Sequence, residues 1–269
     1  MIDVHCHLTY PGLRDKLKDV ISESKGQLRA IVTCGFPIEE SEEHVMERRA
    51  ELDFSSARLA LEIARSNKGF IYVTLGLHPV HAVRLSDSEV ERYIGFIKEH
   101  KDEIVGIGEI GLDRHWIRTE EGERRSKEVF LQMLSLAEEL DKPVVLHLRK
   151  SEDVGVKIVL NNTNLRKVLL HSFSGNMTTA KEALENGFYF SLNPKLSTVK
   201  NAKKIARRFP LDVILTETDA PFLSPTDEPI NRPVNVRYVI EQIARLRGIS
   251  VDEVDRVTTR NAEVFFSIT

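Results

Sequence analysis

Short apolar runs alternate with segments of helical periodicity from one end of the chain to the other, and this alternation restricts the fold more than any other feature. Most of the runs are rich in Val, Ile and Leu, and all have the length of a buried strand. Strands joined through helices are parallel, because each connection crosses back over the sheet. The runs cover residues 2–7, 29–35, 70–77, 104–110, 143–148, 167–173, 188–192 and 213–218. Eight such units in a chain of 269 residues predict an α/β fold, the (β/α)8 TIM barrel.

The segments between the runs have the periodicity of helices. Within 126–141, apolar residues recur at three- and four-residue steps and form one stripe. The segment 39–67 predicts one long helix or two shorter ones, and 234–266 predicts two helices that break at Gly248, with Ser250 as the N-cap of the second. Because the sequence contains neither a Pro- or Gly-rich linker nor an internal repeat, we expect a single domain over residues 1–269.

Imidazole and carboxylate side chains stand at the ends of five of these runs. The carboxyl ends of parallel strands meet at one face of a barrel, so these side chains are expected to converge there. Coincidences at so many strand ends predict one metal site. The residues are His5, His7, Glu109, His147, His171 and Asp219.

The first and fourth runs supply a histidine pair and a carboxylate. His5 and His7 lie two residues apart on a strand, so both face the same side and can chelate one ion. A His-x-His pair alone has low specificity. Glu109 stands among Gly106, Gly108 and Gly111, and its two oxygens can bridge two cations. The alternative is a solvated strand end, but a buried unpaired carboxylate is costly.

The remaining three candidates come from the fifth, sixth and eighth runs. Taken separately, His147 and His171 each fit a hydrogen-bonded core histidine; together they supply imidazoles for a second ion. Asp219 follows the eighth strand, which lies beside the first in a closed barrel. There it can ligate metal and accept a proton from water, although it could also cap the loop that follows.

This set of donors predicts hydrolytic chemistry. Nitrogen and oxygen ligands without a thiolate favour Zn²⁺, Mn²⁺ or Mg²⁺, and we expect two divalent ions. A water between two such ions loses a proton near neutral pH and becomes the nucleophile, so Glu109 and Asp219 are the expected catalytic residues. The two cysteines, Cys6 and Cys34, make no disulfide framework and are expected to be buried thiols.

Charge and hydropathy limit the partners. A net charge of −3 argues against a nucleic-acid binder that relies on bulk positive charge, so any phosphate recognition must be local. No apolar stretch approaches the roughly 20 residues that cross a bilayer, and the first residues do not resemble a signal peptide. We expect a cytoplasmic, monomeric enzyme without a membrane partner.

Several short motifs occur in the order found in one known family. They are Asp-x-His-x-His-Leu, Gly-Leu-His-Pro, Gly-Glu-Ile-Gly-Leu-Asp, Leu-His-x-Arg, His-Ser-Phe-Ser-Gly and Glu-Thr-Asp-Ala-Pro-Phe-Leu. Through them the chain resembles the TatD-related deoxyribonucleases, metal-dependent barrels of the amidohydrolase type, over essentially its whole length. The resemblance implies a barrel that hydrolyses DNA phosphodiester bonds with divalent metals, often as an exonuclease. It also implies that the six residues above are the metal ligands.

The resemblance further assigns residues around the substrate. His78 matches a position near the substrate phosphate, although it could be a loop histidine. Arg149 matches an arginine whose guanidinium suits phosphate, and its alternative is a pair with Asp153. Asp113 is expected to orient a ligand or its own loop rather than to bind metal.

The chain departs from the family pattern at two places. Lys150 stands where the family commonly has Asp, and the segment 227–233 is acidic where the family often carries a basic stretch. Acidic residues there would repel DNA. Basic pairs elsewhere could compensate for this acidic segment, or they could be solvated helix faces. They are Arg124-Arg125, Lys203-Lys204 and Arg207-Arg208. Trp116 and Phe222 could stack a base, or they could be buried.

Two other functions fit the same residues. The first is a small-molecule amidohydrolase, lactonase or phosphoesterase with the same centre. That class often carries a carbamylated lysine, whereas the fourth run here ends in Glu109. The second is a barrel that has lost catalysis and only binds ligands. It predicts the loss of one or more ligands, and all six are present.

Overall fold

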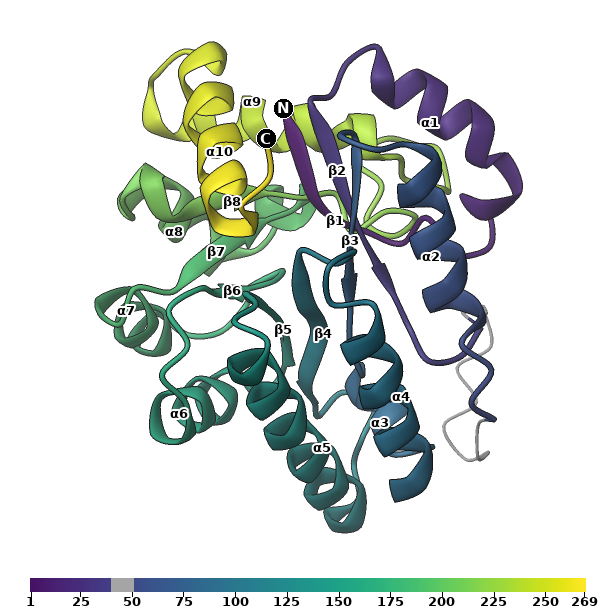
Figure 1. The fold of residues 1–269 in the computed structure, drawn as a ribbon. Coiled ribbons are helices and arrows are strands. Elements are labelled where there is room, and N and C mark those ends of the chain that lie inside the picture. Colours follow the sequence, from purple (N-terminus) through teal and green to yellow (C-terminus); the bar gives the residue numbers. More distant parts are fainter. Residues whose placement is uncertain (40–50) are drawn as a thin grey trace.

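The computed structural model of this chain describes residues 1–39 and 51–269. All eight expected strands are present, and neighbouring strands pair in parallel in the order of the sequence. Helices surround them on the outside, as Figure 1 shows. The predicted (β/α)8 architecture is therefore confirmed. The strands are β1 (Ile2–Cys6), β2 (Ala30–Gly35), β3 (Ile71–Leu75), β4 (Gly106–Asp113), β5 (Val144–Arg149), β6 (Val168–Leu170), β7 (Tyr189–Leu192) and β8 (Ile214–Thr216).

The helices of the described residues mostly follow the strands one by one. They are α1 (Leu17–Lys25), α2 (Ser55–Ser66), α3 (Pro79–Ala82), α4 (Asp87–Glu99), α5 (Glu120–Glu139), α6 (Glu152–Asn162), α7 (Met177–Glu185), α8 (Lys200–Arg208), α9 (Val236–Arg247) and α10 (Val251–Phe266). Four short 3-10 turns join them: η1 (Arg14–Lys16), η2 (Pro194–Ser197), η3 (Leu211–Val213) and η4 (Pro233–Asn235). None of the helices described is long and apolar enough to cross a membrane.

The predicted helices agree with this list where they can be compared. The helix expected around 126–141 is α5, and its inward stripe includes Phe130 and Met133. The two C-terminal helices are separated at Gly248, and Ser250 caps α10 by accepting a hydrogen bond from the backbone N–H of Glu253 (3.1 Å). The helix expected within 39–67 is α2; residues 40–50 of that prediction lie outside the described part.

Hydrogen bonds join the first and last strands and so close the barrel. Beyond β8, the backbone N–H of Asp219 donates to the carbonyl of His5 (3.0 Å), and that of His7 donates to Ala220 (2.7 Å). The buried carboxylate of Asp3 accepts from the backbone N–H (2.8 Å) and the hydroxyl (2.5 Å) of Thr218. This seam brings Asp219 beside His5 of β1 and His7 just beyond it.

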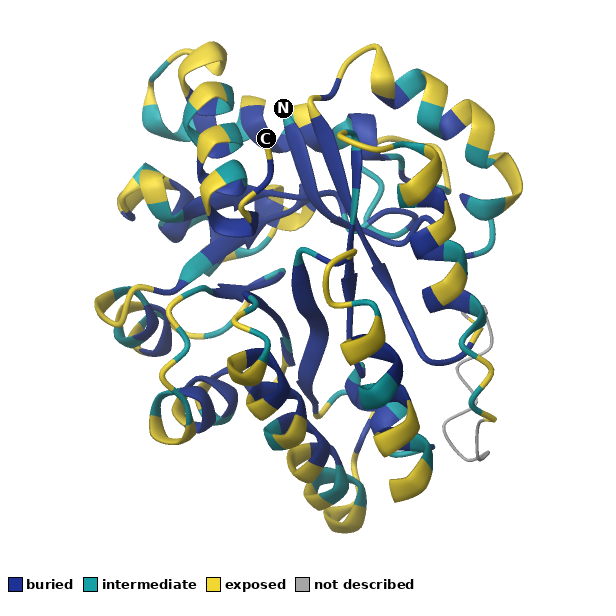
Figure 2. Cartoon of the chain, in the orientation of Figure 1, coloured by how far each residue is buried: buried dark blue, intermediate teal, exposed yellow. Residues whose placement is uncertain are grey.

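The barrel interior is apolar at one end and polar at the other. Alternation along a strand puts Val145 two residues before His147 on β5, and Leu169 two residues before His171 beyond β6. The apolar residues of this kind cluster with Phe265 of α10, at the end of the barrel where the chain termini lie (Figure 1). Figure 2 shows that the strands are buried along their length. The polar residues therefore gather at the opposite, carboxyl end.

Candidate metal centre

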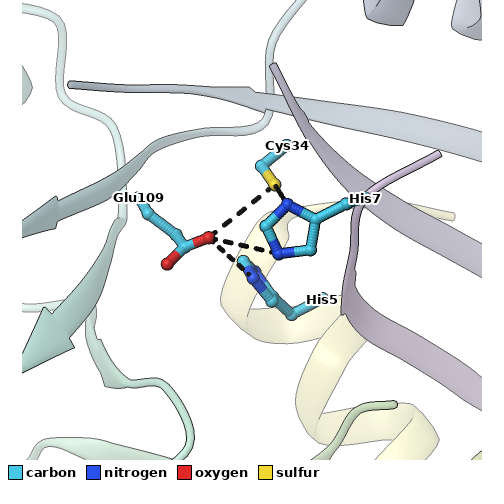
Figure 3. A group of neighbouring side chains, drawn as sticks. All are labelled: His5, His7, Cys34 and Glu109. Atoms are coloured by element: carbon cyan, nitrogen blue, oxygen red, sulfur yellow. Dashed lines mark hydrogen bonds and ion pairs between the residues drawn. The ribbon is translucent and has the colours of Figure 1, made fainter. Parts of the chain in front are cut away.

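Glu109 of β4 lies at the middle of the polar end of the barrel, where it is 2% exposed. Its Oε1 is 3.0 Å from His5 Nε2 and 3.5 Å from His7 Nε2. Its Oε2 is 3.0 Å from His147 Nδ1 and 3.9 Å from His171 Nε2. The two oxygens of one carboxylate thus face two separate pairs of imidazoles. Figure 3 shows the first pair with Glu109.

Asp219 lies on the side of the first pair of imidazoles. Its Oδ1 is 3.3 Å from His7 Nε2 and 3.8 Å from His5 Nε2. The backbone of Asp219 has a φ of 57°, in the left-handed region that non-glycine residues seldom adopt. The hydrogen bond to His5 at the barrel seam holds it there. The structure therefore brings together all six residues that the sequence analysis predicted for the site.

Further side chains hold the other ring nitrogens of these histidines. Asp113 Oδ2 is 2.9 Å from His147 Nε2, and Glu217 Oε2 is 2.9 Å from His171 Nδ1. Each carboxylate is itself held: Asp113 accepts from two backbone N–H groups of its own loop, as its predicted orienting role requires, and Glu217 accepts from Ser191 Oγ (2.5 Å). A carboxylate that binds the far nitrogen of a ligand histidine fixes its ring and raises its basicity.

Cys34 of β2 contacts the second ring nitrogen of His7, as Asp113 and Glu217 do for His147 and His171. Its Sγ is 3.3 Å from His7 Nδ1 and 3.9 Å from Glu109 Oε1, as drawn in Figure 3. The sequence analysis treated Cys34 only as a buried thiol and expected donors without sulfur. The thiol is buried, as expected, and alternation along β2 turns it into the barrel, where it contacts His7. The expected set of nitrogen and oxygen ligands stays a prediction.

The imidazoles and carboxylates shift one another's pKa values. Burial alone would raise the pKa of Glu109, but His5, His147 and His171 outweigh it and hold that pKa well below its ordinary value. Burial lowers the pKa of His147, yet hydrogen bonds to Asp113 and Glu109 raise it to about 9. His171 also rises to a pKa of about 9, because the charge of Glu217 outweighs burial.

His5 and Asp219 shift downward. Burial and the neighbouring His171 lower the pKa of His5, so that ring is neutral at pH 7. Burial raises the pKa of Asp219, but His7 and His171 outweigh it, so its pKa lies below the ordinary value and the carboxylate is ionised. The centre therefore combines ionised carboxylates with a neutral imidazole at His5, while His147 and His171 must each lose a proton before they can bind metal.

The donor set fits divalent metal ions. His5 Nε2 is buried and makes no hydrogen bond with the described residues, although it points toward Glu109 Oε1. Donor atoms of His5, His7, Cys34 and Glu109 lie within 4.8 Å of one another, as do those of Glu109, His147 and His171. Imidazole and carboxylate suit Zn²⁺ and Mn²⁺. Two groups that share Glu109 are what a pair of bridged ions requires.

Glycines make room for this arrangement. A Cβ at Gly76 would lie 2.5 Å from the carbonyl oxygen of Glu109, and one at Gly111 would lie 2.1 Å from that of His147. Gly111 also has a φ of 146°, which side chains other than glycine rarely allow. Gly76, just after β3, and Gly111 of β4 therefore permit β3, β4 and β5 to approach closely at the site.

A pocket of about 470 Å³ opens above the centre, a volume typical of a ligand site, and all of the six residues except His5 line it. Both residues predicted to contact substrate line it. His78 Nε2 lies 4.0 Å from Glu109 Oε2, while its Nδ1 accepts a hydrogen bond from the Val80 backbone N–H and caps α3. Arg149 is exposed at the end of β5. Trp116, 37% exposed, and Phe222 also line the pocket.

Glu217 and Asp3 are the functional residues that the sequence analysis missed. Glu217 is fully buried just beyond β8, two residues before Asp219. A carboxylate inside the run Val-Ile-Leu-Thr-Glu-Thr needs a buried partner, and that was the available signal. Asp3 precedes His5 by the same spacing.

Comparisons with known proteins agree with this geometry. The family profile described as TatD related DNase matches residues 2–267. An uncharacterized metal-dependent hydrolase of Methanocaldococcus jannaschii is 33% identical over 98% of this chain and 96% of its own length. The deoxyribonuclease TATDN3 of Homo sapiens is 31% identical over 99% of this chain and 94% of its own length.

Solved structures share the fold. The TatD homologue YJJV of Escherichia coli superimposes with a TM-score of 0.84 at 23% identity, over 100% of this chain and 98% of that one. An organophosphorus hydrolase of Deinococcus radiodurans gives a TM-score of 0.61 at 12% identity, over 98% of this chain and 92% of that one. At these identities the likeness concerns the barrel alone.

Proposed function

The chain belongs to the TatD related DNase family, a family of metal-dependent hydrolases of ester bonds, and from that premise we propose how it acts. It hydrolyses phosphodiester bonds in DNA as an exonuclease, with two divalent ions, Mg²⁺, Mn²⁺ or Zn²⁺. The two-ion proposal rests on the carboxylate of Glu109. One of its oxygens faces His5 and His7, and the other faces His147 and His171.

Each residue of the centre has a part in this reaction. His5, His7, Asp219 and Glu109 would hold one ion, and His147, His171 and Glu109 would hold the other. When bound, the ions acidify the attacking water and polarise the phosphoryl oxygen. Asp219 would accept the proton of the attacking water, because it is ionised and 16% of its side chain is open to the pocket.

The pocket wall supplies the contacts to the substrate. Arg149 offers a planar guanidinium to the phosphate, and His78 donates or accepts a single hydrogen bond beside it. Trp116 and Phe222 present aromatic faces on which a terminal base can stack, which suits single-stranded ends without demanding a sequence.

A small phosphoester is the second candidate substrate. A pocket of about 470 Å³ holds a drug-sized molecule. The segment after β8 lines it through Phe222 and Leu223 and exposes Asp227 and Glu228 further along, which disfavours a long polyanion. The monomeric, cytoplasmic state expected from the sequence belongs to either candidate and stays part of the proposal.

Metal restoration on defined substrates tests the proposal. Purified protein is stripped with chelator and assayed with Mg²⁺, Mn²⁺ or Zn²⁺ on end-labelled single- and double-stranded DNA and on bis(4-nitrophenyl) phosphate. Metal-dependent release of mononucleotides from one end supports the proposed exonuclease. Turnover of the small diester without DNA cleavage supports the second candidate, and bound metal without turnover of either contradicts both.

A further inference from the structure

The outer face of α8 carries five cationic side chains and no acidic one. They are Lys200, Lys203, Lys204, Arg207 and Arg208, and we call them the α8 basic stripe. The inward face is apolar, with Ala202, Ile205 and Ala206 buried. No Asp or Glu occurs anywhere between Glu185 and Asp212, in a chain whose net charge is −3. Such a local excess of positive charge is suited to a polyanion.

The α8 basic stripe destabilises the helix that carries it. Lys200 begins α8 and the first turn contains no acid, although the amino end of a helix favours negative charge. Lys200, Lys204 and Arg208 follow one another at four-residue spacing, as do Lys203 and Arg207, and like charges at this spacing repel. Within the described residues, no ion pair links the stripe to a carboxylate. An external anion would relieve this repulsion.

The stripe begins at the mouth of the pocket. Lys195 of η2 lines the pocket and is exposed, and Val199 and Ala202, at the start of α8, line it as well. From there α8 runs along the outside of the barrel beside β7, with exposed and half-buried residues on its outer side (Figures 1 and 2). The nine residues of α8 span about 12 Å, so the positive charge extends over that distance from the mouth of the pocket.

The rest of the mouth has mixed charge. Arg84, after β3, and Arg149, at the end of β5, line the pocket, as does Glu39 after β2. The segment after β8 exposes Asp227 and Glu228. Because η2 and α8 carry cations and no acid, they are the part of the mouth best suited to a chain of phosphates.

We propose that the DNA strand extends from the metal centre over η2 and along α8, and that the α8 basic stripe contacts phosphates beyond the one that is cleaved. This inference rests on the proposed hydrolysis of DNA and adds the direction and the surface by which a long substrate is held. Lys203 and Lys204 contact the nearer phosphates, and Arg207 and Arg208 the more distant ones.

The variant Lys203→Glu/Lys204→Glu tests the inference, since neither residue lies at the centre. The affinity of chelator-treated protein for a fluorescent single-stranded 20-mer is measured at several NaCl concentrations. Two lost phosphate contacts lower the slope of log K against log [NaCl] by about 1.4. The variant's kcat/KM falls at least tenfold on the 20-mer and stays within twofold on a trinucleotide. Its Tm does not fall, because glutamate suits the amino-terminal half of a helix better than lysine.

The matched control is Arg256→Glu/Arg260→Glu, which makes the same change in charge on exposed residues of α10, at the other end of the barrel. Wild-type slope and affinity in this control support the inference. An equal loss in both variants, or wild-type slope and length dependence in the α8 variant, overturns it. If the wild-type protein cleaves a small diester but neither binds nor cuts DNA, the proposed function itself fails, and the inference with it.

Discussion

Glu217→Gln tests how the carboxylates behind the centre control it. The variant keeps the shape of the side chain but removes the charge that holds His171 Nδ1 at 2.9 Å. That charge, against burial, raises the pKa of His171 to about 9. His147, held by Asp113, also has a pKa of about 9. Both imidazoles are therefore protonated at pH 7 in the metal-free protein.

The size of the effect on metal affinity follows from the competition between the metal ion and the proton for the same ring nitrogen. Metal binds only the unprotonated nitrogen, so a pKa of about 9 weakens binding at pH 7 by about 100-fold, or about 2.7 kcal/mol, for each imidazole. Since the pKa is raised, metal affinity rises with pH up to about 9 and then levels off. In Glu217→Gln the pKa of His171 falls. Metal binding at pH 7 therefore releases up to one proton fewer than in the wild-type protein. At pH 9 the variant binds metal about 10- to 100-fold more weakly, because the ring has lost its orienting partner.

Calorimetry with Mn²⁺ at pH 7, in buffers of different ionisation enthalpy, counts the released protons. We expect about two from His147 and His171 in the wild-type protein and a smaller number in the variant. Glu152→Gln is the control: Glu152 is also buried, but its carboxylate binds Ser174 and Ser151 instead of an imidazole. Equal proton release from Glu217→Gln and wild type would refute the reasoning.

The other predictions concern the centre and the seam of the barrel. Glu109→Ala should abolish turnover and metal binding while the far-ultraviolet circular dichroism stays native, and wild-type rates would remove Glu109 from the reaction. Asp219→Asn should retain part of the metal, as plasma emission analysis can show, but lose the acidic limb of the pH–rate profile, where the carboxylate otherwise becomes protonated; an unchanged limb would contradict a proton-accepting role. Asp3→Ala leaves buried groups of Thr218 unpaired, so urea unfolding should show a loss of about 3 kcal/mol, and a loss below about 1 kcal/mol would mean that this contact does not hold the seam.

The architecture was predictable because local patterns determine it. Buried parallel strands are apolar on both faces, so each appeared as an unbroken run, and helices such as α5 showed their inward stripe. The observed strand bounds differ from the predicted ones by a few residues, because pairing with neighbouring strands, and not composition, determines where a strand ends. β4 is the largest case: the apolar run stops near residue 110, but pairing with β5 continues to Asp113 and Arg149.

The centre was predictable from the position of polar residues at strand ends, but its supporting contacts were not. His5, Glu109 and Asp219 interrupt apolar sequence where the barrel face must lie. The roles of Cys34 and Glu217, by contrast, depend on residues that follow other strands: Cys34 contacts His7, just beyond β1, and Glu217 contacts His171, just beyond β6. Such partners depend on register around the closed barrel, which the sequence of a single strand does not contain.

Anomalous diffraction from crystals grown with Mn²⁺ tests the central proposal most directly. The account predicts two peaks joined through Glu109, one beside His5, His7 and Asp219 and the other beside His147 and His171. A single peak, or peaks that Glu109 does not contact, would contradict it.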